Sequence, residues 1–201
     1  MALRNHAATA SKLDLVEQAA IYGSYHNNKY NRLVHLVFVP CIVYAFTLWL
    51  AFLPLRVEIP FLTAINPSAF YLSAAHIYVA IQCGYYAILD PIVAGVLTVL
   101  FGGFAFHGQY IIATYGLKTA FIIGLILQIL GWGAQIAVGH AIFEKRRPAI
   151  TDSLFQAFVS PYFMAAENMF ALGYKPELAK RIDDRTEELL KEYRASLKKA
   201  N

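Results

Sequence analysis

The sequence predicts an all-α polytopic membrane protein with about four transmembrane helices, flanking amphipathic helices and both termini in the cytosol. Apolar residues make up 58% of the 201-residue chain, charged residues make up only 15%, and the mean hydropathy is +0.48. Residues 33–138 hold just four charged side chains, Arg56, Glu58, Asp90 and Lys118. So little charge over so long a stretch is typical of several membrane spans.

Four apolar runs are long enough to cross a bilayer, since about 20 helical residues cover roughly 30 Å. They are residues 33–53, 69–89, 92–113 and 119–138. The third run reaches at least Phe106, where the polar stretch His107-Gly108-Gln109 follows. The breaks between runs are marked by Pro54, Pro60 and Pro67, by Asp90-Pro91, and by Gly116-Leu117-Lys118.

The distribution of basic residues predicts the orientation of these spans. Residues 1–32 hold four lysines and arginines, residues 139–201 hold eleven, and the segment between holds two. Because basic residues collect on the cytosolic side, both ends are expected in the cytosol, which requires an even number of spans. Residues 1–31 contain no apolar run of the kind a cleaved signal peptide needs.

Three segments outside the spans have helical patterns. A capping-box pattern over residues 11–14 precedes an amphipathic stretch that ends near His26. Residues 151–172 are apolar, contain Glu167 and are interrupted at Ser160-Pro161, which indicates a broken interfacial segment. Residues 176–199 are highly charged with one apolar stripe, which predicts a surface helix in the cytosol; the stripe is Leu178, Ile182, Leu189, Tyr193 and Leu197.

The composition excludes several classes of protein. The chain is too apolar to be disordered or to read nucleic acid through a basic face, so no nucleic-acid partner is expected. Its two cysteines, Cys41 and Cys83, lie inside apolar runs and are interpreted as small buried hydrophobic residues, which excludes a disulfide-rich scaffold.

The six histidines differ in where the predicted topology places them. His26 and His35 fall at the cytosolic end of the first span and His140 at that end of the fourth, so these three can converge. His76 and His107 fall nearer the opposite side and do not join them. His6 is expected to be solvated in an N-terminal tail.

Spacing adds polar neighbours to the converging histidines. Asn31 and His35 are four residues apart, as are His140 and Glu144, so each pair shares a helix face. Such a set can bind a metal ion, or it can be a hydrogen-bonded cluster that holds two spans together. Both readings stay open from spacing alone, and no zincin motif or phosphate-binding glycine loop is present.

The basic run Lys145-Arg146-Arg147 follows Glu144 directly. It suits an anchor for anionic membrane lipid, and one of its arginines also suits a carboxylate of a substrate. The two roles are compatible.

Two separated segments resemble the fungal 2-hydroxy fatty acid dioxygenase family, which are small endoplasmic reticulum membrane proteins of phytosphingosine breakdown. The first runs from Tyr25 to Pro40 and contains Tyr25-His26-Asn27-Asn28-Lys29-Tyr30-Asn31-Arg32-Leu33-Val34-His35; the second includes Gly131-Trp132, Gln135, Gly139-His140 and Phe143-Glu144-Lys145-Arg146-Arg147-Pro148-Ala149. The similarity covers residues 13–175. Residues 57–117 share only hydropathy with the family, so the resemblance implies no role for His76 or His107.

The resemblance implies an Fe2+-dependent enzyme that uses O2 to shorten a long-chain 2-hydroxy fatty acid, such as 2-hydroxypalmitate, by one carbon with release of CO2. On that basis His26, His35 and His140 are the expected iron ligands and catalytic residues. Glu144 is a fourth ligand or a supporting partner. The expected substrate-binding residues are Asn31, Lys29, Arg146, Arg147 and Gln135. The acyl tail is expected between the spans.

The expected organisation is one membrane-embedded catalytic domain over residues 1–175 and a charged C-terminal helix over residues 176–201. The C-terminal Lys198-Lys199-Ala200-Asn201 resembles a dilysine retrieval signal, which agrees with an endoplasmic reticulum membrane protein whose site faces the cytosol. The main alternative is a non-catalytic lipid-binding or organising membrane protein that binds no iron. A transporter is less consistent with ionisable residues gathered at one face.

Overall fold

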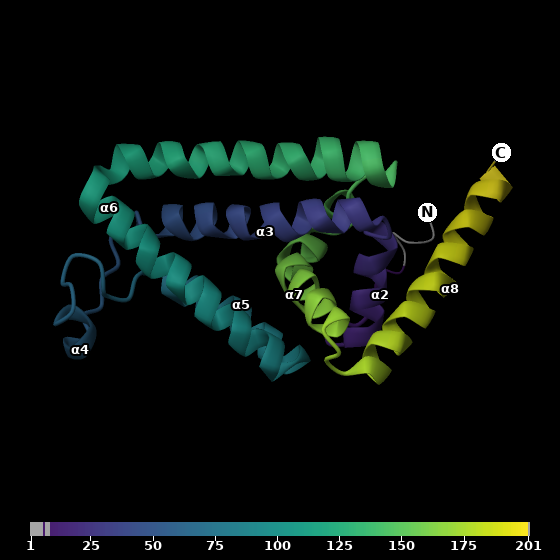
Figure 1. Ribbon diagram of the computed structural model, residues 1–201, viewed down its shortest axis with the longest axis horizontal. Coiled ribbons are helices and arrows are strands. Elements are labelled where there is room, and N and C mark those ends of the chain that lie inside the picture. Colours follow the sequence, from purple (N-terminus) through teal and green to yellow (C-terminus); the bar gives the residue numbers. More distant parts are fainter. Residues whose placement is uncertain (1–5, 7–8, 201) are drawn as a thin grey trace. The chain divides into compact units, whose positions relative to one another are not determined.

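The computed structural model describes residue 6 and residues 9–200 (Figure 1). Within these residues the regular structure is helical, with loops between the helices and one isolated antiparallel bridge between Val57 and Leu72. The predicted all-α class is therefore confirmed. The elements are α2 (Leu15–Tyr25), α3 (Lys29–Leu50), α4 (Pro60–Thr63), α5 (Ala74–Leu89), α6 (Pro91–Gly133), a π-helix η1 (Ala134–Glu144), a 3-10 turn η2 (Ala149–Thr151), α7 (Leu154–Ala171) and α8 (Pro176–Ala200).

The chain forms two compact units. One consists of the described parts of Met1–Leu36 and Gln135–Asn201, and the other is Val37–Ala134. Helix α3 begins in the first unit and continues into the second. Every residue that the sequence nominated for the site belongs to the first unit.

Helix α2 starts at Asp14, whose Oδ1 accepts a hydrogen bond from the backbone N of Glu17 at 3.0 Å. The N-cap is thus the last residue of the predicted capping box, while Ser11 accepts from the backbone N of Leu13 in the preceding turn. Helices α2 and α8 lie side by side (Figure 1). The guanidinium of Arg185 donates to the Glu17 carboxylate at 2.7 Å, beside a buried apolar contact that includes Ala20, Ile21, Tyr25 and Leu189.

The predicted break at Ser160-Pro161 was wrong, because helix α7 runs through Pro161 without interruption. Val159, Tyr162 and Phe163 are fully buried around the proline. We attribute the continuity to this packing, since burial of such side chains outweighs the loss of one backbone hydrogen bond.

The C-terminal segment is helical as predicted. Ile182 and Leu189 of its apolar stripe are buried, whereas Leu197 is exposed. His6 was expected to be solvated; its side chain is 30% exposed, and its Nε2 also lies 2.8 Å from the Glu192 carboxylate on α8. Asn201, the last residue of the retrieval-like sequence, lies outside the described residues.

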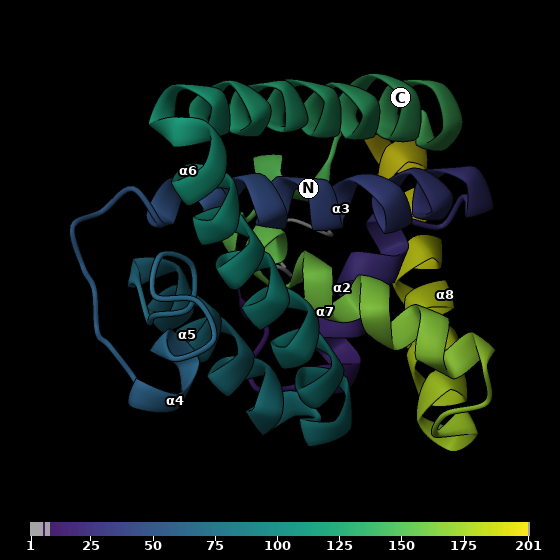
Figure 2. The same cartoon turned by 60° about the vertical axis from the view of Figure 1, so that its left-hand side comes forward.

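Most of the apolar helical residues belong to the second unit. Lys29–Leu50 and the continuous helical stretch Pro91–Glu144 are long and apolar enough to cross a membrane, and Ala74–Leu89 is apolar but shorter. Helix α5 packs against α6 (Figure 2). The predicted second run began five residues too early, at 69. Residues 57 and 72 pair through two backbone hydrogen bonds of 2.9 Å, and Ser73 then caps α5 together with His76.

The last two predicted runs both lie in α6. This helix is kinked at Gly116, whose backbone is not helical: φ is 79° and ψ is 165°. This conformation is open to glycine and strained for other residues. The chain changes direction sharply within α6 (Figure 1). The predicted gap at residues 116–118 is therefore in place, whereas the polar stretch His107-Gly108-Gln109 lies inside the helix.

Candidate metal centre

Three buried histidines meet in the first unit. His26 caps the C-terminal end of α2, His35 lies in the first part of α3, and His140 lies in η1. One ring nitrogen of each lies within 4.8 Å of those of the other two. Each side chain is at most 4% exposed. The predicted convergence of these three histidines is confirmed as geometry.

Hydrogen bonds fix which ring nitrogens of two histidines are free. Nδ1 of His26 lies 2.8 Å from the backbone O of Tyr22, and Nδ1 of His35 lies 3.0 Å from the backbone O of Asn31. A carbonyl oxygen only accepts, so each Nδ1 carries the proton and each neutral Nε2 presents a lone pair. This arrangement, in which a backbone carbonyl orients the imidazole, is the usual one for metal-binding histidines.

The two Nε2 atoms lie 3.2 Å apart. Two lone pairs at that distance repel unless a proton or a cation lies between them. Two nitrogens that bind one ion at about 2.1 Å and at right angles are about 3 Å apart, so the separation suits a shared metal ion. Burial, followed by the neighbouring His35 and His140, holds the pKa of His26 well below its ordinary value, which keeps the imidazole neutral.

Buried polar atoms without partners mark the same place. Nδ1 of His140, Oδ1 of Asn31 and Nε2 of Gln135 are buried and have no hydrogen-bond partner within the described residues. Buried polar groups are nearly always paired in folded proteins. These unpaired atoms fit a site that binds a polar ligand or a metal ion, with Nε2 of Gln135 as a hydrogen-bond donor and Oδ1 of Asn31 as an acceptor. Neutral imidazole suits iron, zinc, copper and nickel.

The π-helix η1 presents the third histidine. Its buried residues are Gln135, Gly139 and His140, and residues five apart align along a π-helix. At Gly139 an added Cβ would overlap Oδ1 of Asn31 and would lie 3.5 Å from Cε1 of His35. The glycine thus allows η1 to approach α3 closely enough to bring His140 to the other two histidines.

Glu144 connects η1 to the start of α3. Its carboxylate accepts from the backbone N of Asn27 at 3.2 Å, the backbone N of Asn28 at 2.9 Å and Nδ2 of Asn31 at 3.1 Å. Nδ2 of Asn28 donates to the backbone O of Phe143 at 3.0 Å. Both carboxylate oxygens are engaged in these contacts, and the group of converging metal-binding atoms contains only the histidines among the described residues. The geometry favours the supporting role over the ligand role for Glu144.

Comparison with known proteins gives the family. The family described as 2-hydroxy-palmitic acid dioxygenase Mpo1-like matches residues 13–171. The chain belongs to this family. A relative named 2-hydroxy-palmitic acid dioxygenase MPO1, from Saccharomyces cerevisiae, is 34% identical over 167 residues, which cover 83% of this chain and 86% of the relative. No solved structure matches the chain.

In this Mpo1-like chain, Arg146 and Arg147 are both engaged in contacts outside the histidine cluster. Nη1 of Arg146 donates to the backbone O of Ser24 at 2.7 Å, and its guanidinium lies 4.1 Å from the ring centres of both Tyr25 and Tyr193. Arg147 forms an ion pair of 2.8 Å with Asp152. Their substrate-binding roles stay predictions, because a substrate carboxylate would have to compete with these contacts for the two guanidinium groups.

Lys29 is exposed, and its ammonium lies 5.1 Å from the ring centre of Tyr30. His76 and His107 belong to the second unit. There His76 accepts a hydrogen bond from the backbone N of Ser73, and His107 lies 2.8 Å from the hydroxyl of Tyr44. Neither is in the converging group.

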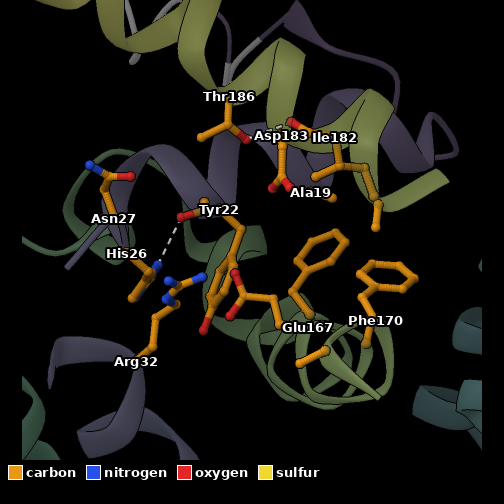
Figure 3. Close-up of a pocket in the computed structure, with 15 residues that line it drawn as sticks. Ala19, Tyr22, His26, Asn27, Arg32, Glu167, Phe170, Ile182, Asp183 and Thr186 are labelled. Carbon is orange, nitrogen blue, oxygen red and sulfur yellow. Dashed lines mark hydrogen bonds between the residues drawn. The ribbon is translucent and has the colours of Figure 1, made fainter. Parts of the chain in front are cut away.

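The sequence reasoning missed a cavity beside His26 that is lined by Tyr22, Arg32 and Glu167, among other residues (Figure 3). One signal was available, because a carboxylate such as Glu167 within an apolar segment is costly and often functional. Arg32 gave no such signal, since it stands directly before the predicted span 33–53, where a basic residue is ordinary.

Proposed function

We propose that this member of the Mpo1-like family is an Fe2+-dependent dioxygenase that removes one carbon from long-chain 2-hydroxy fatty acids. The substrate class and the use of O2 come from the name of the yeast relative. The observation that supports a metal in this chain is the pair of Nε2 lone pairs that face each other at 3.2 Å beside a third histidine.

The proposed reaction balances without an outside electron donor. A 2-hydroxy acid and O2 give the acid one carbon shorter, CO2 and water. The bond between C1 and C2 breaks, C2 becomes the new carboxyl carbon, and the substrate supplies the four electrons that reduce O2. Bound iron would supply a centre able to react with O2 and to polarise the oxygens of the substrate.

Residues of the chain would hold and orient the reacting groups. His26, His35 and His140 would hold the ion, and the backbone carbonyls of Tyr22 and Asn31 would keep the first two imidazoles in the required tautomer. Glu144 would fix the loop between α2 and α3 against η1. Burial of the cluster would limit the access of water to the reacting atoms.

The membrane location and the topology of the enzyme are part of the same proposal. Four spans near residues 33–53, 74–89, 91–115 and 117–138, with both termini in the cytosol, would place the site at the cytosolic surface of the endoplasmic reticulum membrane. The two long apolar helices and the shorter α5 support a membrane location. Membrane lipid would then surround the exposed apolar side chains of α5 and α6.

The test measures iron and product together. The full chain is purified in detergent, loaded with Fe2+ without oxygen, and then given O2 and 2-hydroxypalmitate. Mass spectrometry should detect pentadecanoate, and His35→Ala and His140→Ala should reduce turnover at least a hundredfold, whereas His6→Ala should retain it. Folded protein that binds no iron and forms no product would instead favour the non-catalytic lipid-binding alternative.

A further inference from the structure

A cavity of about 300 Å³ opens beside His26 and lies entirely within the first unit. Its walls come from α2, α7 and α8 and from Arg32 near the start of α3. This volume is at the lower end of the range for small-molecule sites. It is therefore large enough for the head and first methylenes of a fatty acid.

The lining of the cavity has an apolar part and a polar part. Phe163, Phe170 and Ile182 supply apolar surface, and Arg32, Glu167 and Asp183 supply charge (Figure 3). His26 belongs to the same lining and is stacked on Tyr22 with 4.0 Å between ring centres. The cavity thus combines polar and apolar surface next to one of the converging histidines.

Arg32 is the cation of this lining, and it differs from the arginines that the sequence nominated. Its side chain forms no hydrogen bond or ion pair within the described residues, whereas Arg146 and Arg147 are both engaged. Burial raises the pKa of both Glu167 and Tyr22, and the positive charge of Arg32 acts to lower each pKa, so the guanidinium lies near these two side chains. In Figure 3 its guanidinium points toward His26, Tyr22 and Glu167.

We infer that this cavity binds the carboxylate of the 2-hydroxy fatty acid, with the Arg32 guanidinium as its partner and the apolar wall against the first methylenes. A guanidinium binds a carboxylate through two parallel hydrogen bonds, which fixes orientation as well as position. A carboxylate held there lies next to C2 and its hydroxyl, and His26 lines the same cavity. The inference rests on the proposed function for the identity of the ligand.

The acidic residues of the cavity do not neutralise Arg32 fully. Burial raises the pKa of Glu167 to about 7, against the lowering effect of Arg32, so a large part of this carboxyl is uncharged at neutral pH. Asp183 is exposed, which weakens its field. Arg32 therefore keeps positive charge available for an incoming anion.

The test uses metal-free full-length protein and two ligands that differ at one end. The ligands are 2-hydroxypalmitate and 1,2-hexadecanediol, which lacks the carboxylate, and affinity is read from the ligand-dependent rise in the thermal unfolding midpoint. Arg32→Gln should weaken 2-hydroxypalmitate roughly tenfold or more and change the diol less than about twofold, because only the acid uses the guanidinium. Arg32→Lys should lie between Arg32→Gln and the parent.

Two matched controls make the result specific. Arg181→Gln, on an exposed part of α8 outside the cavity lining, should leave both affinities unchanged. Ala171→Trp, which projects into the cavity, should weaken both ligands, whereas Ala195→Trp on an exposed part of α8 should weaken neither. Unchanged binding of 2-hydroxypalmitate by Arg32→Gln, or equal loss of both ligands, would overturn the inference.

Turnover separates this inference from the proposed function. If the iron-loaded parent makes no pentadecanoate but the metal-free binding pattern holds, the dioxygenase proposal fails and the carboxylate site stands. If the parent makes product and Arg32→Gln has an unchanged KM, the carboxylate site fails and the dioxygenase proposal stands.

Discussion

Individual hydrogen bonds decide which side chains near the histidine cluster still have an atom available to bind a metal ion and which do not. The Nε2 atoms of His26 and His35 are left free because each Nδ1 is bound to a carbonyl. The oxygens of Glu144 are occupied by three N–H groups. Residue type alone makes all three side chains equal candidates for a metal, and the hydrogen bonds distinguish them.

Glu144→Gln tests this division. An amide offers one acceptor oxygen in place of a carboxylate, so contacts to Asn27, Asn28 and Asn31 are lost or weakened. We expect the free energy of unfolding to fall by about 1–3 kcal/mol while the iron content stays near that of the parent. Denaturation and metal analysis of the same preparation measure both quantities. Loss of iron from a variant of unchanged stability would show that Glu144 is a ligand.

The raised pKa of Glu167 predicts a pH-dependent stability. Because the folded value is about 7 and the ordinary value is 4.5, the folded state holds the proton more tightly between these pH values. Stability is therefore expected to fall as pH rises through that window. Arg32, Asp183 and Tyr22 are the charged or titratable groups that act on it or face it.

Glu167→Gln removes this titration. The variant should melt at a higher temperature than the parent at pH 8, and the difference should shrink toward pH 4.5. Thermal unfolding in detergent at several pH values measures it, with Glu177→Gln on exposed α8 as the matched control. An equal difference at all pH values would contradict the prediction.

At the scale of elements, the approach of η1 to α3 decides whether His140 reaches its partners. The π-helical geometry and the absence of a side chain at Gly139 act together here. An α-helical pattern predicts that His140 and Glu144 share a face, but it does not predict a wider helix or the close contact with Asn31. π-helical turns often occur at functional sites.

Gly139→Ala should disturb this contact. The added Cβ overlaps Oδ1 of Asn31, so we expect unfolding free energy to fall by about 1–3 kcal/mol and iron affinity to fall roughly tenfold. Gly133→Ala is the control, since its Cβ would meet no heavy atom within 4 Å. Denaturant titration and competition with an iron chelator give the two numbers. Equal behaviour of the two variants would remove the role assigned to Gly139.

At the scale of the whole molecule, the charge distribution predicts one membrane topology. Both basic ends are expected in the cytosol, and the loop near residues 54–68 is expected on the opposite side. The apolar helices agree with a membrane location by length and composition.

Cysteine labelling on sealed endoplasmic reticulum vesicles tests this topology. In a background of Cys41→Ala and Cys83→Ala, we expect Ser11→Cys and Ala195→Cys to react with a membrane-impermeant maleimide. Ser68→Cys should react only after permeabilisation. Labelling of Ser68→Cys in sealed vesicles would exclude the four-span arrangement.

The sequence by itself determined the helical class and the apolar runs, and it nominated the three histidines that the packing of η1 against α3 then brings together. The class and the runs follow from local causes, because a bilayer requires long apolar helices and glycine or proline often marks where the chain turns. The break at Gly116 and the charged helix α8 were readable for the same reason.

Only the tertiary structure decided which polar groups remain free. Arg146, Arg147 and Arg32 are alike as sequence, yet the first two contact Ser24 and Asp152, while Arg32 lines the cavity beside His26. The continuity of α7 through Pro161 and the contact of His6 with Glu192 also depend on partners far away in the chain. Whether a side chain is free for function depends on the rotation and packing of its helix, and local sequence does not contain that information.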